Sequence, residues 1–142
     1  MRIPLIVRTE KGEEDTHIPR PLLVAMGKIR RKLFRAEFLV DTGGPYTLLG
    51  YSDFQRLRLP LKGRMRSMMI AGFKLRAYSQ GEVELNVGTE DREITSIVVR
   101  NLYACERAER HIPSILGVDT LRDNNLVLVF DAANGMGYLE KS

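Results

Sequence analysis

One segment combines residue types that could carry acid–base chemistry. The run FLVDTGGPYTLL delivers Asp41 from an apolar stretch directly into Thr42, Gly43 and Gly44. Glycines permit a tight backbone turn and leave open space in front of a carboxylate. The segment therefore predicts an acid held rigidly at the end of a strand, near backbone amides. An ordinary turn is the alternative, because Asp, Thr and Gly are common turn formers.

A second segment, SILGVDTL, places Ile115 and Leu116 directly before Gly117. In order along the chain, the apolar strand, Asp-Thr-Gly, a mid-chain hairpin and apolar-apolar-Gly followed by Asp-x-Leu resemble the retropepsin-like aspartic proteases. ILGVDTL and the helix-like YSDFQRLRL look more like the cellular and bacterial branch than the retroviral one. Two departures from the retroviral pattern are Pro45, where an acid is usual, and Val118 in place of an Arg. The resemblance covers about residues 21–140.

The resemblance implies a role for each matched residue. Asp41 matches the catalytic aspartate, Thr42 the residue whose hydroxyl braces the opposite loop across a dimer axis, and Gly43 a position beside substrate. The expected substrate-binding residues are Gly44, Tyr46, Leu48, Met69, Ile70, Ala71, Gly72 and Ile115. The expected structural supports are Leu116, Gly117 and Asp119. For Asp119, the residue pattern itself favours a helix N-cap.

The chain holds one such Asp motif, whereas peptide hydrolysis of this type needs two carboxylates that share a proton. An isologous twofold homodimer would supply the pair, with Asp41 and its symmetry mate at the axis. The expected activity is that of an aspartic endopeptidase acting on polypeptides, with no cofactor and no metal. The alternative is a non-catalytic homodimeric domain of the same fold that binds peptides or joins partners.

The hydrophobic pattern predicts an all-β chain. The expected fold is the retropepsin-like acid protease fold, a small closed β-barrel with a flap hairpin and one or two short helices. Strands are predicted at residues 3–8, 21–26, 36–41, 73–78, 82–87, 93–102 and 125–130. Turns are predicted near Gly72 and at Asn134-Gly135. One helix is predicted within residues 48–60, opened by a capping box of Ser52 and Gln55, and a second is opened by Asp119.

Composition places the chain among ordinary folded proteins. Of 142 residues, 44% are hydrophobic and 28% charged, and 22 Lys plus Arg against 18 Asp plus Glu give a net charge of +4. We expect a single domain over 1–142, with an N-terminal strand and loop at 1–20 and the core at 21–140. The single Cys105 cannot form an intramolecular disulfide and is predicted to pack in the core. No apolar run is long enough to span a membrane, so a cytoplasmic location is expected.

Other chemistry-bearing residues favour plainer interpretations. The basic stretch at 28–35 is predicted to be a solvated hairpin turn, and nucleic-acid binding is disfavoured because interleaved aromatic residues are few. His17 and His111 have no partners at metal-ligand spacing. Met65, Met68 and Met69 fit either an adaptable substrate wall or ordinary strand packing, and the sequence does not decide between them.

Overall fold

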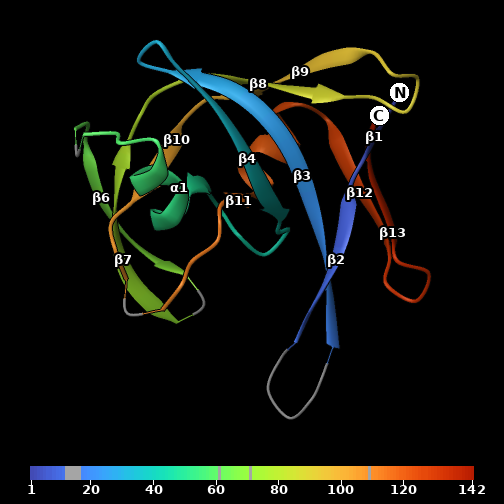
Figure 1. Cartoon of the computed structure of the whole chain (residues 1–142), viewed down its shortest axis with the longest axis horizontal. Coiled ribbons are helices and arrows are strands. Elements are labelled where there is room, and N and C mark those ends of the chain that lie inside the picture. Colours follow the sequence, from blue (N-terminus) through green and yellow to red (C-terminus); the bar gives the residue numbers. More distant parts are fainter. Residues whose placement is uncertain (12–16, 61, 71, 109) are drawn as a thin grey trace.

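Strands dominate the chain, whose computed structural model describes residues 1–11, 17–60, 62–70, 72–108 and 110–142 (Figure 1). The helices of this described part are α1 (Tyr51–Arg56) and α2 (Val118–Asp123), and neither is long enough to cross a membrane. The strands are β1 (Arg2–Pro4), β2 (Ile6–Lys11), β3 (His17–Ile29), β4 (Lys32–Val40), β5 (Thr47–Leu49), β6 (Met65–Ile70), β7 (Phe73–Ser79), β8 (Val83–Gly88), β9 (Ile94–Val99), β10 (Leu102–Cys105), β11 (Ile115–Leu116), β12 (Leu126–Asp131) and β13 (Met136–Lys141). The predicted all-β class with two short helices is confirmed.

The main sheet is open rather than closed. Its strand order is β6-β7-β10-β5-β11-β4-β3-β8-β9, with β2 paired to β3 beside this path, and β1-β13-β12 form a separate sheet. Within the described residues no pairing joins β6 to β9. Strand β6 pairs only with β7, and β9 pairs only with β8. Figure 1 shows β6 and β7 on one flank and β9 across the top on the other side. The expected closed barrel is therefore wrong.

Alternation of side chains builds the core. Val83, Leu85 and Val87 on β8 are buried, whereas the intervening Glu84 and Asn86 are exposed, as a strand with one face on the core requires. The larger buried cluster gathers side chains from β3, β4, β8 and β9 and from the three-stranded sheet. A smaller group, here called the flap cluster, lies under β6 and β7 and consists of Leu48, Met68, Leu75, Ala77, Tyr103, Cys105, Ile112 and Ile115.

Two predicted turns are confirmed. The basic stretch forms the turn between β3 and β4, in which Arg30 and Arg31 have φ of 48° and 67°. Asn134 lies in the turn between β12 and β13, and its backbone N–H and side-chain Nδ2 donate to Asp131 at 3.1 and 2.7 Å. Gly135 takes φ of 62°, the left-handed conformation that favours glycine.

Both predicted helix starts are wrong. The N-cap of α1 is Gly50 and that of α2 is Gly117, and neither helix has a side-chain cap. Ser52 and Asp119 instead lie inside the first turns. At both positions the glycine backbone approaches another segment so closely that a Cβ would collide with it, at Ile112 O for Gly50 and at Tyr46 O for Gly117. These tertiary contacts, rather than side-chain capping, set where each helix begins.

Candidate active site

Strand β4 holds the backbone of Asp41 in place. The strand ends at Val40, and the Asp41 N–H donates to Leu116 O at 3.0 Å. Leu116 lies opposite Val40 in the parallel pairing of β11 with β4. Two residues before Asp41, Leu39 N–H donates to Ser114 O at 2.8 Å. Hydrogen bonds between β4 and the segment of β11 therefore fix the backbone that carries the acid.

The glycines after Asp41 shape the space around its carboxylate. Gly43 N–H donates to Asp41 Oδ1 at 2.9 Å, and Gly44 N–H donates to Asp41 O at 3.1 Å. A Cβ on Gly44 would stand 3.3 Å from Asp41 Oδ2 and 3.4 Å from Ile115 Cγ2. Side chains at these positions would crowd the acid, which is partly exposed. The glycines thus both anchor the carboxylate and keep its face open.

Thr47 supports this loop from below and was not singled out by the sequence analysis. It is fully buried, and its hydroxyl donates to Asp119 Oδ1 at 2.8 Å and accepts from Gly117 N–H at 3.0 Å. Its oxygen also lies 2.6 Å from Thr120 Oγ1. Asp119 therefore ties the Asp41 loop to α2 instead of capping the helix. Thr47 belongs to the same segment, FLVDTGGPYTLL, but nothing near it in the sequence shows which groups its hydroxyl binds.

Gly117 lies under the same loop. A Cβ at this position would collide with Tyr46 O and Gly44 O, and Val118 N–H donates to Gly44 O at 2.8 Å. The loop carrying Asp41 rests directly on the start of α2 because residue 117 has no side chain.

Strands β6 and β7 form the hairpin expected to be the flap, and β6 lies across a cavity from Asp41. This cavity of about 80 Å³ is lined by Asp41, Gly43, Gly44, Pro45, Tyr46, Met69, Ile70 and Ile115. Among the described residues, Asp41 is the only acid that lines it. Its other side chains are apolar or aromatic, and the strand carrying Met69 and Ile70 is β6. The structure thus brings together most of the residues expected to bind substrate.

Some expected site residues lie elsewhere. Leu48, expected to contact substrate, is 1% exposed in the flap cluster, because β5 runs between β11 and β10 and pairs it with Ile115 and Tyr103. Thr42 is exposed beside the cavity, and its hydroxyl has no partner among the described residues. Gly72 has φ of 82° with open space around it. Ala71 lies outside the described residues.

The methionines divide between the two interpretations. Met68 is buried in the flap cluster, Met69 lines the cavity at Asp41 and Met65 is half-exposed. The neighbouring residues Met68 and Met69 therefore have different roles, one in packing and one in the cavity wall, because successive side chains of a strand point to opposite faces.

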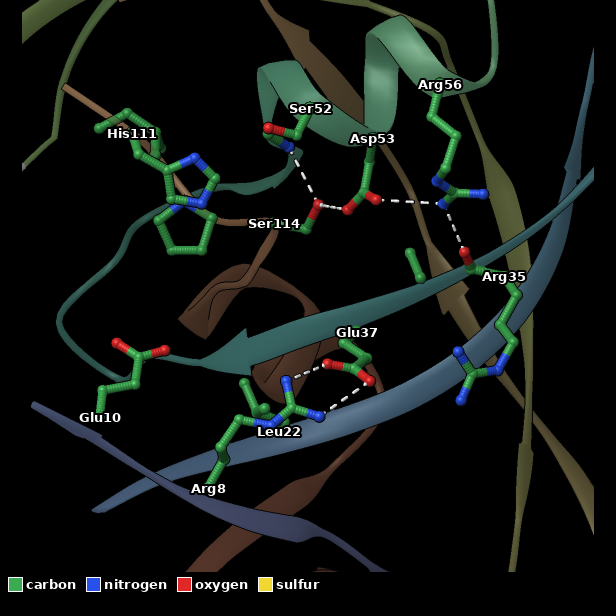
Figure 2. Close-up of a pocket in the computed structure, with 14 residues that line it drawn as sticks. Arg8, Glu10, Leu22, Arg35, Glu37, Ser52, Asp53, Arg56, His111 and Ser114 are labelled. Atoms are coloured by element: carbon green, nitrogen blue, oxygen red, sulfur yellow. Dashed lines mark hydrogen bonds and ion pairs between the residues drawn. The ribbon is translucent and has the colours of Figure 1, made fainter. Parts of the chain in front are cut away.

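A second, larger cavity of about 530 Å³ lies between β4, α1 and residues 111–114 (Figure 2). Four of the charged side chains that line it form two ion pairs. Arg8 Nη1 lies 2.6 Å from Glu37 Oε2, and Arg56 Nη2 lies 3.1 Å from Asp53 Oδ1. The Arg8 guanidinium lowers the pKa of the Glu37 carboxyl by hydrogen bonding to its charged form. Arg56 Nη2 also donates to Arg35 O at 2.6 Å, which joins α1 to β4 and indicates a structural brace between helix and sheet.

Ser114 joins α1 to β11 in this brace, and removing its hydroxyl should destabilise the fold. The hydroxyl accepts from Gly50 N–H at 3.0 Å and donates to Asp53 Oδ2 at 2.5 Å (Figure 2). Ser114→Ala leaves a buried N–H without a partner, which we expect to lower the free energy of unfolding by about 2 kcal/mol. Urea unfolding measures this value. The matched control is Ser67→Ala, at an exposed position on β6, for which a comparable loss would contradict the assigned role.

Other candidate groups carry no chemistry in the described structure. Cys105 is 1% exposed, and burial raises the pKa of its thiol to about 12, so it packs in the core as predicted. His17 and His111 are exposed. No three His, Cys, Asp or Glu side chains of the described residues gather closely enough to hold a metal ion.

Comparison with known structures identifies the fold. The chain is similar to a retropepsin-like aspartic protease from Rickettsia conorii, with 16% identity over 98% of this chain and 90% of that one and a TM-score of 0.56. It also matches EIAV protease in complex with the inhibitor HBY-793, with 17% identity over 85% of this chain and 100% of that one and a TM-score of 0.47. No family model and no curated protein matches the sequence. The chain therefore has the retropepsin-like fold.

Proposed function

We propose that the chain is a homodimeric aspartic endopeptidase that hydrolyses peptide bonds with water held between Asp41 of two copies. The observation that carries this proposal is the placement of Asp41. Its carboxylate stands at a strand end, accepts a hydrogen bond from Gly43 N–H and lines a cavity whose other side chains are apolar or aromatic. A lone acid of this kind lacks the proton-sharing partner that the chemistry needs, and a twofold axis beside Thr42 would supply it.

The proposed reaction uses the two carboxylates in opposite protonation states. The ionised one accepts a proton from water as the water oxygen bonds to the peptide carbonyl carbon, and the protonated one donates its proton to the carbonyl oxygen. The tetrahedral intermediate then collapses. The C–N bond breaks, the leaving nitrogen receives a proton from one carboxylate, and the new acid returns its hydroxyl proton to the other.

The walls of the cavity define the expected substrate. Tyr46, Met69, Ile70 and Ile115 present apolar or aromatic surface to whatever lies beside Asp41. An apolar side chain next to the cleaved bond would bury this surface. Because β6 lies at one edge of the sheet within the described strands, an extended polypeptide can also hydrogen-bond along it.

We expect cleavage of an unfolded protein that a statine-containing peptide blocks. The statine hydroxyl occupies the position of the attacking water, and mimics of the tetrahedral state bind about 10² to 10⁸ times more tightly than substrates. Product peptides are measured by mass spectrometry at acidic and neutral pH, with a peptide lacking the statine hydroxyl as control. Binding of an extended peptide without cleavage at any pH would favour a non-catalytic peptide-binding domain.

A further inference from the structure

Beyond the cavity at Asp41 lie two neighbouring hollows, the farther of which is basic. The cavity shares Pro45 and Tyr46 with a neighbouring hollow of about 420 Å³. That hollow in turn shares Asn101 and Tyr103 with a third, of about 620 Å³. The three hollows adjoin one another in a row that leads away from Asp41, here called the groove. We call its far end the Arg66 hollow, lined by Arg64, Met65, Arg66, Ser79, Asn101 and Tyr103.

Arg66 is positioned by aromatic side chains of the active site. Its guanidinium carbon lies 4.5 Å from the centre of the Tyr46 ring, and Tyr46 packs edge-on against Tyr103 at 5.6 Å. Tyr46 also lines the cavity at Asp41. Stacking on a ring limits the freedom of the side chain while leaving the guanidinium N–H donors available. Tyr46 therefore contacts Arg66 and also lines the cavity at Asp41.

The charge of the Arg66 hollow is not neutralised within the described part of the chain. Its lining includes Arg64 and Arg66 and no acid, and neither arginine forms an ion pair with a described residue. In the intervening hollow, by contrast, Arg100 and Arg122 both pair with Asp123, at 3.7 and 3.5 Å. Two arginines without counter-charge beside a groove favour an anionic ligand group.

The floor of the Arg66 hollow is polar and already ordered. Ser79 Oγ lies 2.5 Å from Asn101 Oδ1, and Asn101 Nδ2 donates to the Tyr103 hydroxyl oxygen at 3.0 Å. The Tyr103 hydroxyl accepts this bond, so its own hydrogen can be donated to an incoming acceptor. A carboxylate is an acceptor only, so it matches both this donor and the arginines.

We propose that Arg66, assisted by Arg64, binds the carboxylate of an Asp or Glu side chain in the substrate, so that cleavage requires an apolar residue at the cut and favours an acid on either flank. The twofold axis of the proposed homodimer places one Arg66 hollow on each side of the cut. The inference rests on the proposed proteolysis at Asp41. It adds the substrate class: polypeptides with an acidic residue a few positions from an apolar cleavage position.

The test uses decapeptides with two central apolar residues. A Glu is placed at one position at a time, up to four residues either side of the centre, and each peptide has a Gln counterpart. We expect the wild-type chain to cleave the Glu peptide with about tenfold higher kcat/KM than its Gln counterpart at corresponding positions on the two sides of the centre, since the Gln peptide lacks the charge-assisted bond. Arg66→Gln should bring this ratio to about one, and Arg66→Lys should keep part of it.

The matched control is Arg92→Gln, which removes the same charge in the turn before β9, at the opposite end of the strand order from β6. This variant should keep the Glu-to-Gln ratio of the wild type. A ratio that survives in Arg66→Gln, or a wild type without any preference for Glu, would overturn the inference. A merely structural role of Arg66 would lower kcat/KM for both peptides equally.

Fluorescence polarisation of the same labelled peptides separates this inference from the proposed function. If Glu peptides bind about tenfold more tightly than Gln peptides but no peptide is cleaved, acid recognition stands and proteolysis fails. If peptides are cleaved without a charge preference, proteolysis stands and the inference fails. If no peptide is bound or cleaved, both fail.

Discussion

Replacing Asp41 with Asn should abolish peptide hydrolysis and leave the fold unchanged. An amide cannot accept the proton of the attacking water, so we expect kcat/KM to fall by at least about 10⁴-fold. The fold should persist because the partly exposed carboxylate accepts one hydrogen bond, from Gly43 N–H, and the Asn amide oxygen can accept the same bond. Peptide cleavage and urea unfolding measure the two effects on the same preparation.

Mixing Asp41→Asn with the wild type tests whether two copies share the reaction. If chains pair at random, an equal mixture contains about one quarter wild-type dimers, and activity per wild-type chain falls to about half. A chain that works alone would lose none of its activity on mixing. Activity that stays proportional to the wild-type chains, or an active Asp41→Asn variant, would therefore contradict the shared-acid mechanism.

The sequence predicts those features of the site that depend on residues close together in the chain. An apolar strand that ends at an acid before two glycines specifies both the strand and the turn, and the structure places Asp41 at the end of β4 with Gly43 N–H on its carboxylate. The contact between Thr47 and Asp119 joins residues 72 positions apart, so no pattern near either residue contains it. Sequence therefore indicates which acid is presented, but not what holds it.

The same division explains the errors in the predicted helix starts. A capping box describes a side chain and the three residues after it, and Ser52 with Gln55 satisfies that pattern. The helix nevertheless begins after Gly50, whose backbone lies against Ile112 and whose N–H is bound by Ser114 Oγ. Contacts with a segment some 60 residues away override the local preference.

An uninterrupted apolar run also prevented the prediction of two separate strands in one segment. Residues 93–102 were predicted as one strand, but β9 ends at Val99 and β10 begins at Leu102. Between them, the side chain of Asn101 bonds to Ser79 and to the Tyr103 hydroxyl. The chain thereby passes from the β8 hairpin to a place between β7 and β5, which hydropathy alone cannot reveal.

Gly117→Ala should damage both stability and activity although it adds a single methyl group. Its φ of −88° suits any residue, so the effect is steric and not conformational. The new Cβ would collide with the carbonyl oxygens of Tyr46 and Gly44, which belong to the loop that carries Asp41. Backbone atoms cannot rotate away as a side chain does, so the loop must move off α2. We expect unfolding free energy to fall by about 3 kcal/mol, which lowers Tm by roughly 10 °C.

The displaced loop should also misplace the acid. A shift of about 1 Å can reduce a rate about 10²-fold, so kcat/KM should fall by that factor even in the fraction that remains folded at 25 °C. Gly88→Ala is the matched control, since a Cβ there meets nothing within 4 Å, and it should change stability by less than about 0.5 kcal/mol. Equal effects of the two substitutions would show that the close contact under the loop is not what positions Asp41. Loss of stability in Gly117→Ala with full activity would show that Asp41 is held by β4 and β11 alone.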